Sequence, residues 1–104
     1  MIQTWFEALG GGLVLPDGWY GRPYDNQHAL TSIEADGERL TITLDQKITL
    51  RFTGLRAVEE RQNELMLGPF TNLIVDCEPY GSGGEHWTRE YRAATVRFVR
   101  PPGI

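Results

Sequence analysis

Apolar and polar side chains alternate most regularly in the middle of the chain. Residues 40–44 alternate apolar side chains with threonine, and residues 48–52 alternate again after the break Asp45-Gln46-Lys47. A period of two is typical of a strand with one buried face. A three-residue loop places Leu44 opposite Ile48, so both apolar sets lie on one side of the sheet. This segment therefore predicts a β-hairpin.

Turn residues separate further segments that have strand character. Asp36-Gly37 predicts a hairpin between residues 30–35 and 38–44, because the favoured two-residue turn needs positive φ at its centre. In the C-terminal part, the apolar set of residues 87–99 changes parity at Ala93-Ala94, which predicts a β-bulge within one long strand. The remaining expected strands are residues 13–15, 55–60, 64–67 and 70–78.

The N-terminus follows a different period. Apolar residues stand at the i, i+3, i+4 and i+7 spacing of one helix face, namely Ile2, Trp5, Phe6 and Leu9. The glycines at 10–12 would end such a helix. A short edge strand is the alternative interpretation of this segment.

Strands that recur about every 8 to 12 residues, with turn signals between them, are typical of all-β domains. The 104-residue chain is 40% hydrophobic and 23% charged, which suits one folded core. We therefore expect residues 1–104 to form a single β-domain. The expected architecture is an antiparallel meander of about seven strands, forming a curled sheet, a small barrel or a sandwich, with at most one short N-terminal helix.

Charge and cysteine content narrow the class of protein. The net charge of −4 argues against a dedicated nucleic-acid binder, which needs a basic face to neutralise phosphates. The single cysteine, Cys77, excludes an internal disulfide and favours a reducing compartment. Neither a secretory signal nor an apolar run of about 18 residues is present. We expect a cytoplasmic protein that binds neither nucleic acid nor membrane.

The segment from Pro16 to His28 carries the strongest candidate site. It combines wide aromatic rings with polar side chains and lacks both the helical and the strand repeat. This mixture is typical of protein hot spots and of pockets for flat ligands. In the alternative interpretation the rings plug the end of the fold and the polar groups bond to nearby backbone. The candidate binding residues are Trp19, Tyr20, Arg22, Tyr24, Asp25 and His28.

Catalytic and metal chemistry find less support. Asp25 could orient His28 for proton transfer, but no nucleophile motif accompanies this pair. The histidines lack the ligand spacing of a zinc site, and the glycines at 81–84 lack the Lys-Ser/Thr that completes a phosphate loop. We therefore assign no catalytic residue, metal or cofactor.

The resulting hypothesis is a small non-enzymatic β-domain that acts by binding. Its partner would be another protein, docked on the segment of residues 16–28, or a second copy of the chain that pairs through an open sheet edge. The alternatives are a β-barrel that binds a small molecule with the same residues, and an acid–base enzyme that uses Asp25 and His28.

Overall fold

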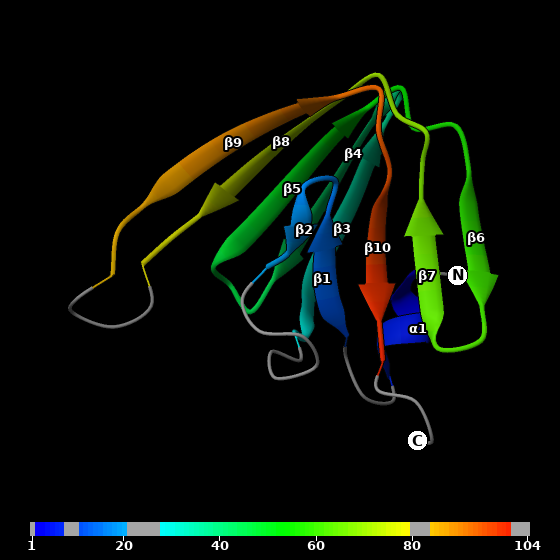
Figure 1. The fold of residues 1–104 in the computed structure, drawn as a ribbon, viewed down its shortest axis with the longest axis horizontal. Coiled ribbons are helices and arrows are strands. Elements are labelled where there is room, and N and C mark those ends of the chain that lie inside the picture. The colour runs from blue at the N-terminus through cyan, green and yellow to red at the C-terminus, as the bar shows by residue number, and fades with distance from the viewer. Residues whose placement is uncertain (1, 8–10, 21–27, 80–83, 101–104) are drawn as a thin grey trace.

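The computed structural model describes residues 2–7, 11–20, 28–79 and 84–100, and within them it has one helix and ten strands (Figure 1). The strands form two antiparallel sheets of five. The β10 sheet has the order β2-β1-β10-β7-β6, formed by Gly18–Trp19, Gly12–Leu15, Val96–Val99, Glu64–Leu67 and Val58–Arg61. The β9 sheet has the order β3-β4-β5-β8-β9, formed by Leu30–Asp36, Arg39–Leu44, Ile48–Thr53, Asn72–Cys77 and Trp87–Arg92. The helix α1 spans Ile2–Glu7.

The two sheets enclose one apolar core. Each sheet sends alternate side chains inward, and the fully buried ones are Leu13, Leu65, Leu67, Val96 and Phe98 from the β10 sheet and Ile42, Leu44, Ile48, Leu50, Phe52, Leu73 and Val75 from the β9 sheet. The all-β prediction is confirmed, and the sandwich is the observed arrangement among the three considered. The described strands do not close into a barrel, because each sheet ends in two edge strands.

The hairpin predicted from residues 40–52 is confirmed as β4 and β5. Leu44 lies directly opposite Ile48, and both side chains are fully buried. The hairpin of β3 and β4 is also present, but Asp36 pairs with Arg39, so its turn is centred on Gly37 and Glu38. Gly37 has φ 61°, which matches a turn with glycine at the first central position.

The chain does not continue as one bulged strand through residues 87–99, as the parity change had suggested. β9 ends at Arg92 in one sheet, and β10 begins at Val96 in the other. Ala93 between them has φ 50°, and the chain passes from the β9 sheet to the β10 sheet at this point. The parity change at Ala93-Ala94 therefore marks a switch of sheets, where the inward direction reverses. Such switches, together with the pairing of β5 with β8 and of β7 with β10, make the order more complex than a meander of seven strands.

The helical prediction for the N-terminus is confirmed for Ile2–Glu7, whereas Leu9 lies outside the described residues. Trp5 and Phe6 are buried, and the Phe6 ring packs edge-on against Phe98 of β10 with 4.8 Å between centroids. The Arg100 guanidinium lies 4.1 Å from the Trp5 ring centroid and bonds the Trp5 carbonyl. Figure 1 shows α1 behind β10 and β7. A six-residue helix is not stable alone, so this docking holds it.

The sandwich is a single compact domain with a radius of gyration of 13.0 Å, close to the value of about 13 Å for a folded chain of 100 residues. In the part of the chain that the structure describes, α1 is the one helix, and it is too short to cross a bilayer.

Candidate functional site

The structure describes half of the predicted site. Trp19, Tyr20 and His28 are placed, whereas Arg22, Tyr24 and Asp25 lie outside the described residues. Trp19 of β2 stands opposite Val14 of β1. Val14 lies between Leu13 and Leu15, which both point into the core. Alternation therefore puts Trp19 on the outer face of the β10 sheet. Tyr20 turns inward instead, and its hydroxyl lies 3.1 Å from the Cys77 sulfur of the opposite sheet. The two neighbouring rings do not share one surface.

His28 lies in the interior, with 4% of its surface exposed. Its Nδ1 lies 2.6 Å from Oδ2 of Asp45, and Oδ1 of the same carboxylate accepts the Ala29 N–H at 2.9 Å. Because a carboxylate accepts, Nδ1 is assigned as the donor. The His28 N–H also donates to the Gly11 carbonyl at 2.8 Å, and the Gly11 N–H donates back at 3.1 Å. We call His28, Ala29 and Asp45 the His28–Asp45 latch, because they hold the start of β3 against the hairpin loop.

The latch contains a polar atom that no described residue satisfies. Nε2 of His28 is buried and has no hydrogen-bond partner among the described residues. The Tyr20 ring lies 5.4 Å from the imidazole, centroid to centroid. Sequence reasoning paired His28 with Asp25, but the carboxylate that it meets in the described structure is Asp45. The position of Asp45 in a three-residue loop pointed only to a turn.

A second group of side chains forms between β2 and β9, each of which is one of the two edge strands of its sheet. We call Asp17, Tyr20, Trp87, Arg89 and Tyr91 the β2–β9 aromatic cluster. The Tyr20 and Trp87 rings lie 5.8 Å apart, and the Arg89 guanidinium lies 4.8 Å from the Trp87 ring centroid. The Tyr91 hydroxyl donates to Asp17 at 3.1 Å, and Arg89 reaches the same carboxylate at 3.8 Å. The cluster therefore joins the Pro16-Asp17 turn to β9 across the edge of the sandwich.

Strand alternation explains how β9 contributes three residues to one group. Trp87, Arg89 and Tyr91 stand opposite inward residues of β8, so they project from the inner face of the β9 sheet. Figure 1 shows β9 at the outer edge of this sheet, beyond β2 of the other sheet. The cluster is therefore only partly covered. The rings of Tyr20, Trp87 and Tyr91 are half-buried, and the Arg89 side chain is 56% exposed.

The environment of Tyr91 keeps its hydroxyl protonated. Burial raises the pKa of the phenol, the Arg89 guanidinium opposes this shift, and the Asp17 carboxylate adds to it. A protonated Tyr91 donates to Asp17 and fixes the turn. Sequence analysis missed Trp87, Arg89 and Tyr91 as site residues. Their spacing at i, i+2 and i+4 indicates one face of a strand, but no local signal reveals that this face meets Asp17.

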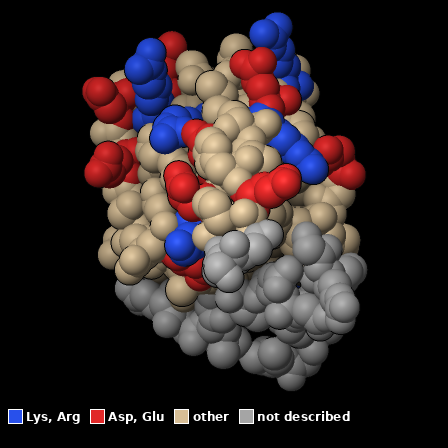
Figure 2. All heavy atoms as spheres, turned by 90° about the vertical axis from the view of Figure 1, so that its left-hand side faces the viewer, with Lys and Arg blue, Asp and Glu red and all other residues tan. Residues whose placement is uncertain are grey.

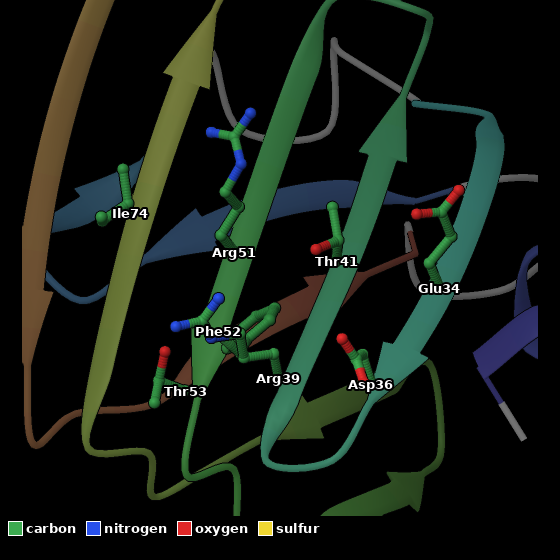
Figure 3. A pocket seen from close by; sticks show the side chains of 8 residues that line it. All are labelled: Glu34, Asp36, Arg39, Thr41, Arg51, Phe52, Thr53 and Ile74. Carbon is green, nitrogen blue, oxygen red and sulfur yellow. The ribbon is translucent and has the colours of Figure 1, made fainter.

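The outer face of the β9 sheet carries a shallow hollow of about 520 Å³ (Figure 3). In the close-up, Arg39 reaches from β4 across β5, whereas Arg51 points away from it along β5. The two guanidinium groups do not converge, so they do not form one anion site. The residues that line the hollow are Glu34, Asp36, Arg39, Thr41, Arg51, Phe52, Thr53 and Ile74.

Asp76 connects three side chains on this outer face. Its carboxylate accepts hydrogen bonds from the Thr88 hydroxyl and from Arg51, both at 2.5 Å, and lies 3.2 Å from Nε2 of His86. The Thr88 hydrogen bond, followed by Arg51, lowers the pKa of Asp76 below its ordinary value of 3.8. Asp76 therefore joins β5, β8 and β9 on the solvent side as a carboxylate.

Asp76→Asn is expected to lower the free energy of unfolding at pH 7 by about 1 kcal/mol, because charge-assisted bonds are lost at a partly exposed site. A carboxyl group whose pKa is depressed by folding stabilises above its unfolded pKa and loses this effect as pH falls through the folded pKa. The difference between wild type and variant should thus shrink below about pH 4. Urea unfolding at several pH values measures it, with Glu90→Gln as the control. A difference that stays constant with pH would contradict this account.

Among the residues that the structure describes, no three His, Cys, Asp or Glu side chains are placed to hold one metal ion. His28 and His86 contact different aspartates, Asp45 and Asp76. No protein-family model matches the chain, and neither the curated proteins nor the solved structures contain a significant match.

Proposed function

We propose that the protein is a non-enzymatic binding module that docks another protein on the β2–β9 aromatic cluster. The observation that carries this proposal is the exposed Arg89 guanidinium stacked beside half-buried aromatic rings at an open edge of the sandwich. Arginine, tryptophan and tyrosine are the residues most enriched at the energetic centres of protein interfaces.

The cluster is also rigid in a way that favours binding. Its side chains come from strands and from a turn, and Tyr91 and Tyr20 are each fixed by a hydrogen bond, to Asp17 and to Cys77. A surface whose rotamers are fixed before contact loses less conformational entropy when a partner docks. In this proposal the segment of residues 16–28 contributes Asp17 and Tyr20.

The other residues of the predicted site have different parts in this proposal. His28 is buried and bonded to Asp45, so we assign it a positioning role for the start of β3 rather than a contact with the partner. Trp19 lies on the outer face of the β10 sheet and would contact only a partner that reaches around the edge. An acid–base mechanism through His28 would need the imidazole to be accessible, which its burial opposes.

The test compares two charge reversals on the same strand. Arg89→Glu changes the cluster, whereas Arg92→Glu reverses an arginine that is 77% exposed on the opposite face of β9. Partner proteins are crosslinked in cells and quantified by mass spectrometry. The amount captured by Arg89→Glu should be at least about tenfold lower than the amount captured by wild type, as expected for a hot spot. The amount captured by Arg92→Glu should equal that of wild type.

Circular dichroism and thermal unfolding must show that both variants are folded. Equal capture by wild type, Arg89→Glu and Arg92→Glu would exclude the cluster as the docking site. A small-molecule function would give a different result. A compound that raises the Tm of wild type but not that of Arg89→Glu would assign the cluster to a ligand instead of a protein.

A further inference from the structure

We propose that β9 pairs with β9 of a second copy of the chain, so that two β9 sheets form one continuous antiparallel sheet of ten strands. A free strand edge presents unpaired backbone N–H and C=O groups, which are a template for another strand. This inference concerns assembly and does not depend on the identity of any other partner.

Of the four edge strands in the described sheets, β9 is the one best suited to this pairing. β2 has two residues and β6 has four, which are too few for a long ladder. β3 has seven residues, but its register shifts between Leu30 and Ser32, and α1 packs beside it. β9 has six residues in unbroken register with β8.

Electrostatics favour the same edge. The chain carries a net charge of −4, so two copies repel unless they meet at a neutral surface. β3 carries Glu34 and Asp36, and β6 carries two glutamates and one arginine, so both edges are acidic. On β9, two arginines and one glutamate give +1, and Asp17 beside Arg89 brings the sum to zero. Figure 2, which views the molecule from the β9 side, shows acidic and basic side chains interspersed.

The alternation of β9 selects the register. Residues that oppose each other across an antiparallel pair lie on the same face. The two-fold axis of a symmetric pair of β9 strands must therefore pass through a residue and not between two residues. If five residues of each strand are to pair, that residue is Arg89 or Glu90. An axis at Arg89 places Trp87 opposite Tyr91 of the second copy, twice, on the inner face. Aromatic pairs of this kind stabilise neighbouring strands. The two opposed Arg89 side chains are each balanced by Asp17 of their own copy. An axis at Glu90 leaves Trp87 without an opposite ring.

This arrangement completes the β2–β9 aromatic cluster. Each Trp87 gains a ring from the second copy, and both clusters lie on the same face of the ten-stranded sheet because the two-fold axis is perpendicular to it. A protein docked as proposed above would meet two copies of the cluster at once, and linked sites of this kind strengthen binding without a new type of contact.

The first experiment measures the mass of the pure protein, with no other protein present. Sedimentation should show a concentration-dependent dimer between about 1 µM and about 1 mM, a range that spans weak and moderate affinities. Arg89→Glu places four carboxylates at the axis and should raise the dissociation constant at least about tenfold. Arg92→Glu changes an exposed side chain on the outer face of β9, outside the five paired residues, and Glu60→Lys lies on β6, so each should leave the dissociation constant within about threefold. A wild-type monomer at every concentration would overturn the proposal.

The second experiment fixes the register. Directly opposed residues of antiparallel strands have a Cα separation that a disulfide can span. Under mild oxidation, Arg89→Cys should form a disulfide-linked dimer, whereas Glu90→Cys should not. A crosslink through Glu90→Cys alone would overturn the Arg89 register. Cys77 is buried and present in both variants, so it serves as the shared background.

The two proposals can fail separately. A monomer that still captures a protein through Arg89 would exclude the dimer and retain the proposed function. A dimer whose Arg89→Glu variant still captures as much protein as wild type would retain the dimer and exclude the proposed function.

Discussion

Phe98→Ala is expected to lower the free energy of unfolding by about 3 to 5 kcal/mol, which is the typical loss when a buried phenylalanine is truncated. Phe98 is fully buried on β10, and its ring contacts both aromatic residues of α1, with centroid distances of 4.8 Å to Phe6 and 6.4 Å to Trp5. The truncation therefore removes core volume and also the surface on which α1 docks. Since α1 has six residues, we expect it to unfold first in this variant.

Urea unfolding followed by tryptophan fluorescence measures the effect. Phe98→Leu is the matched control, because it retains most of the volume and should lose less than about 2 kcal/mol. If Phe98→Ala and Phe98→Leu were equally stable, the packing of α1 on β10 would not be the source of the stabilisation.

Asp45→Ala is expected to lower the free energy of unfolding by about 3 kcal/mol, because it leaves the buried His28 ring without its acceptor and also removes the acceptor of the exposed Ala29 N–H. The Asp45 carboxylate accepts the bonds of the His28 ring and of the Ala29 N–H in the His28–Asp45 latch. Asp45 also has φ 53°, a conformation that aspartate and asparagine adopt more readily than alanine. The loss should spread to residue 11, whose backbone is bonded to His28.

Asp45→Asn separates the contributions. Asparagine keeps one acceptor and the tolerance for positive φ, so it should lose only about 1 kcal/mol. Amide hydrogen exchange at Gly11, His28 and Ala29 should accelerate in Asp45→Ala and change little in Asp45→Asn. Equal losses in the two variants would mean that the carboxylate contacts do not hold the start of β3.

Local features of the chain could be predicted from the sequence. The hairpin of residues 40–52 has a strict alternation and a short loop, so its register follows from neighbours in sequence. The helix of residues 2–7 has the apolar spacing of one helix face, which favoured a helix over the alternative of a short edge strand. The partners of β10 could not be predicted, because Phe98 pairs with Leu13 and Leu65, and pairing between distant segments has no local signal.

The candidate site was predictable in composition but not in arrangement. The sequence shows that residues 16–28 are rich in aromatic side chains, yet strand alternation sends Trp19 outward and Tyr20 inward. Asp17 was interpreted as a turn residue, and the structure adds that its carboxylate meets Tyr91 of the opposite sheet. Contacts between the edges of two sheets depend on how far each sheet extends, which a pattern along one strand does not indicate.

The central place of β10 bears on how the chain matures during synthesis. β10 separates β1 from β7 in its sheet, yet among the described strands it follows all the others in sequence and is therefore synthesised after them. The five strands of the β9 sheet can pair as soon as residue 92 has emerged, whereas β1 and β2 must wait as an unattached hairpin. We expect nascent chains that stop before Val96 to remain exposed to chaperones and proteases, and the synthesis of β10 to join β1 and β2 to β7 and β6 in one sheet.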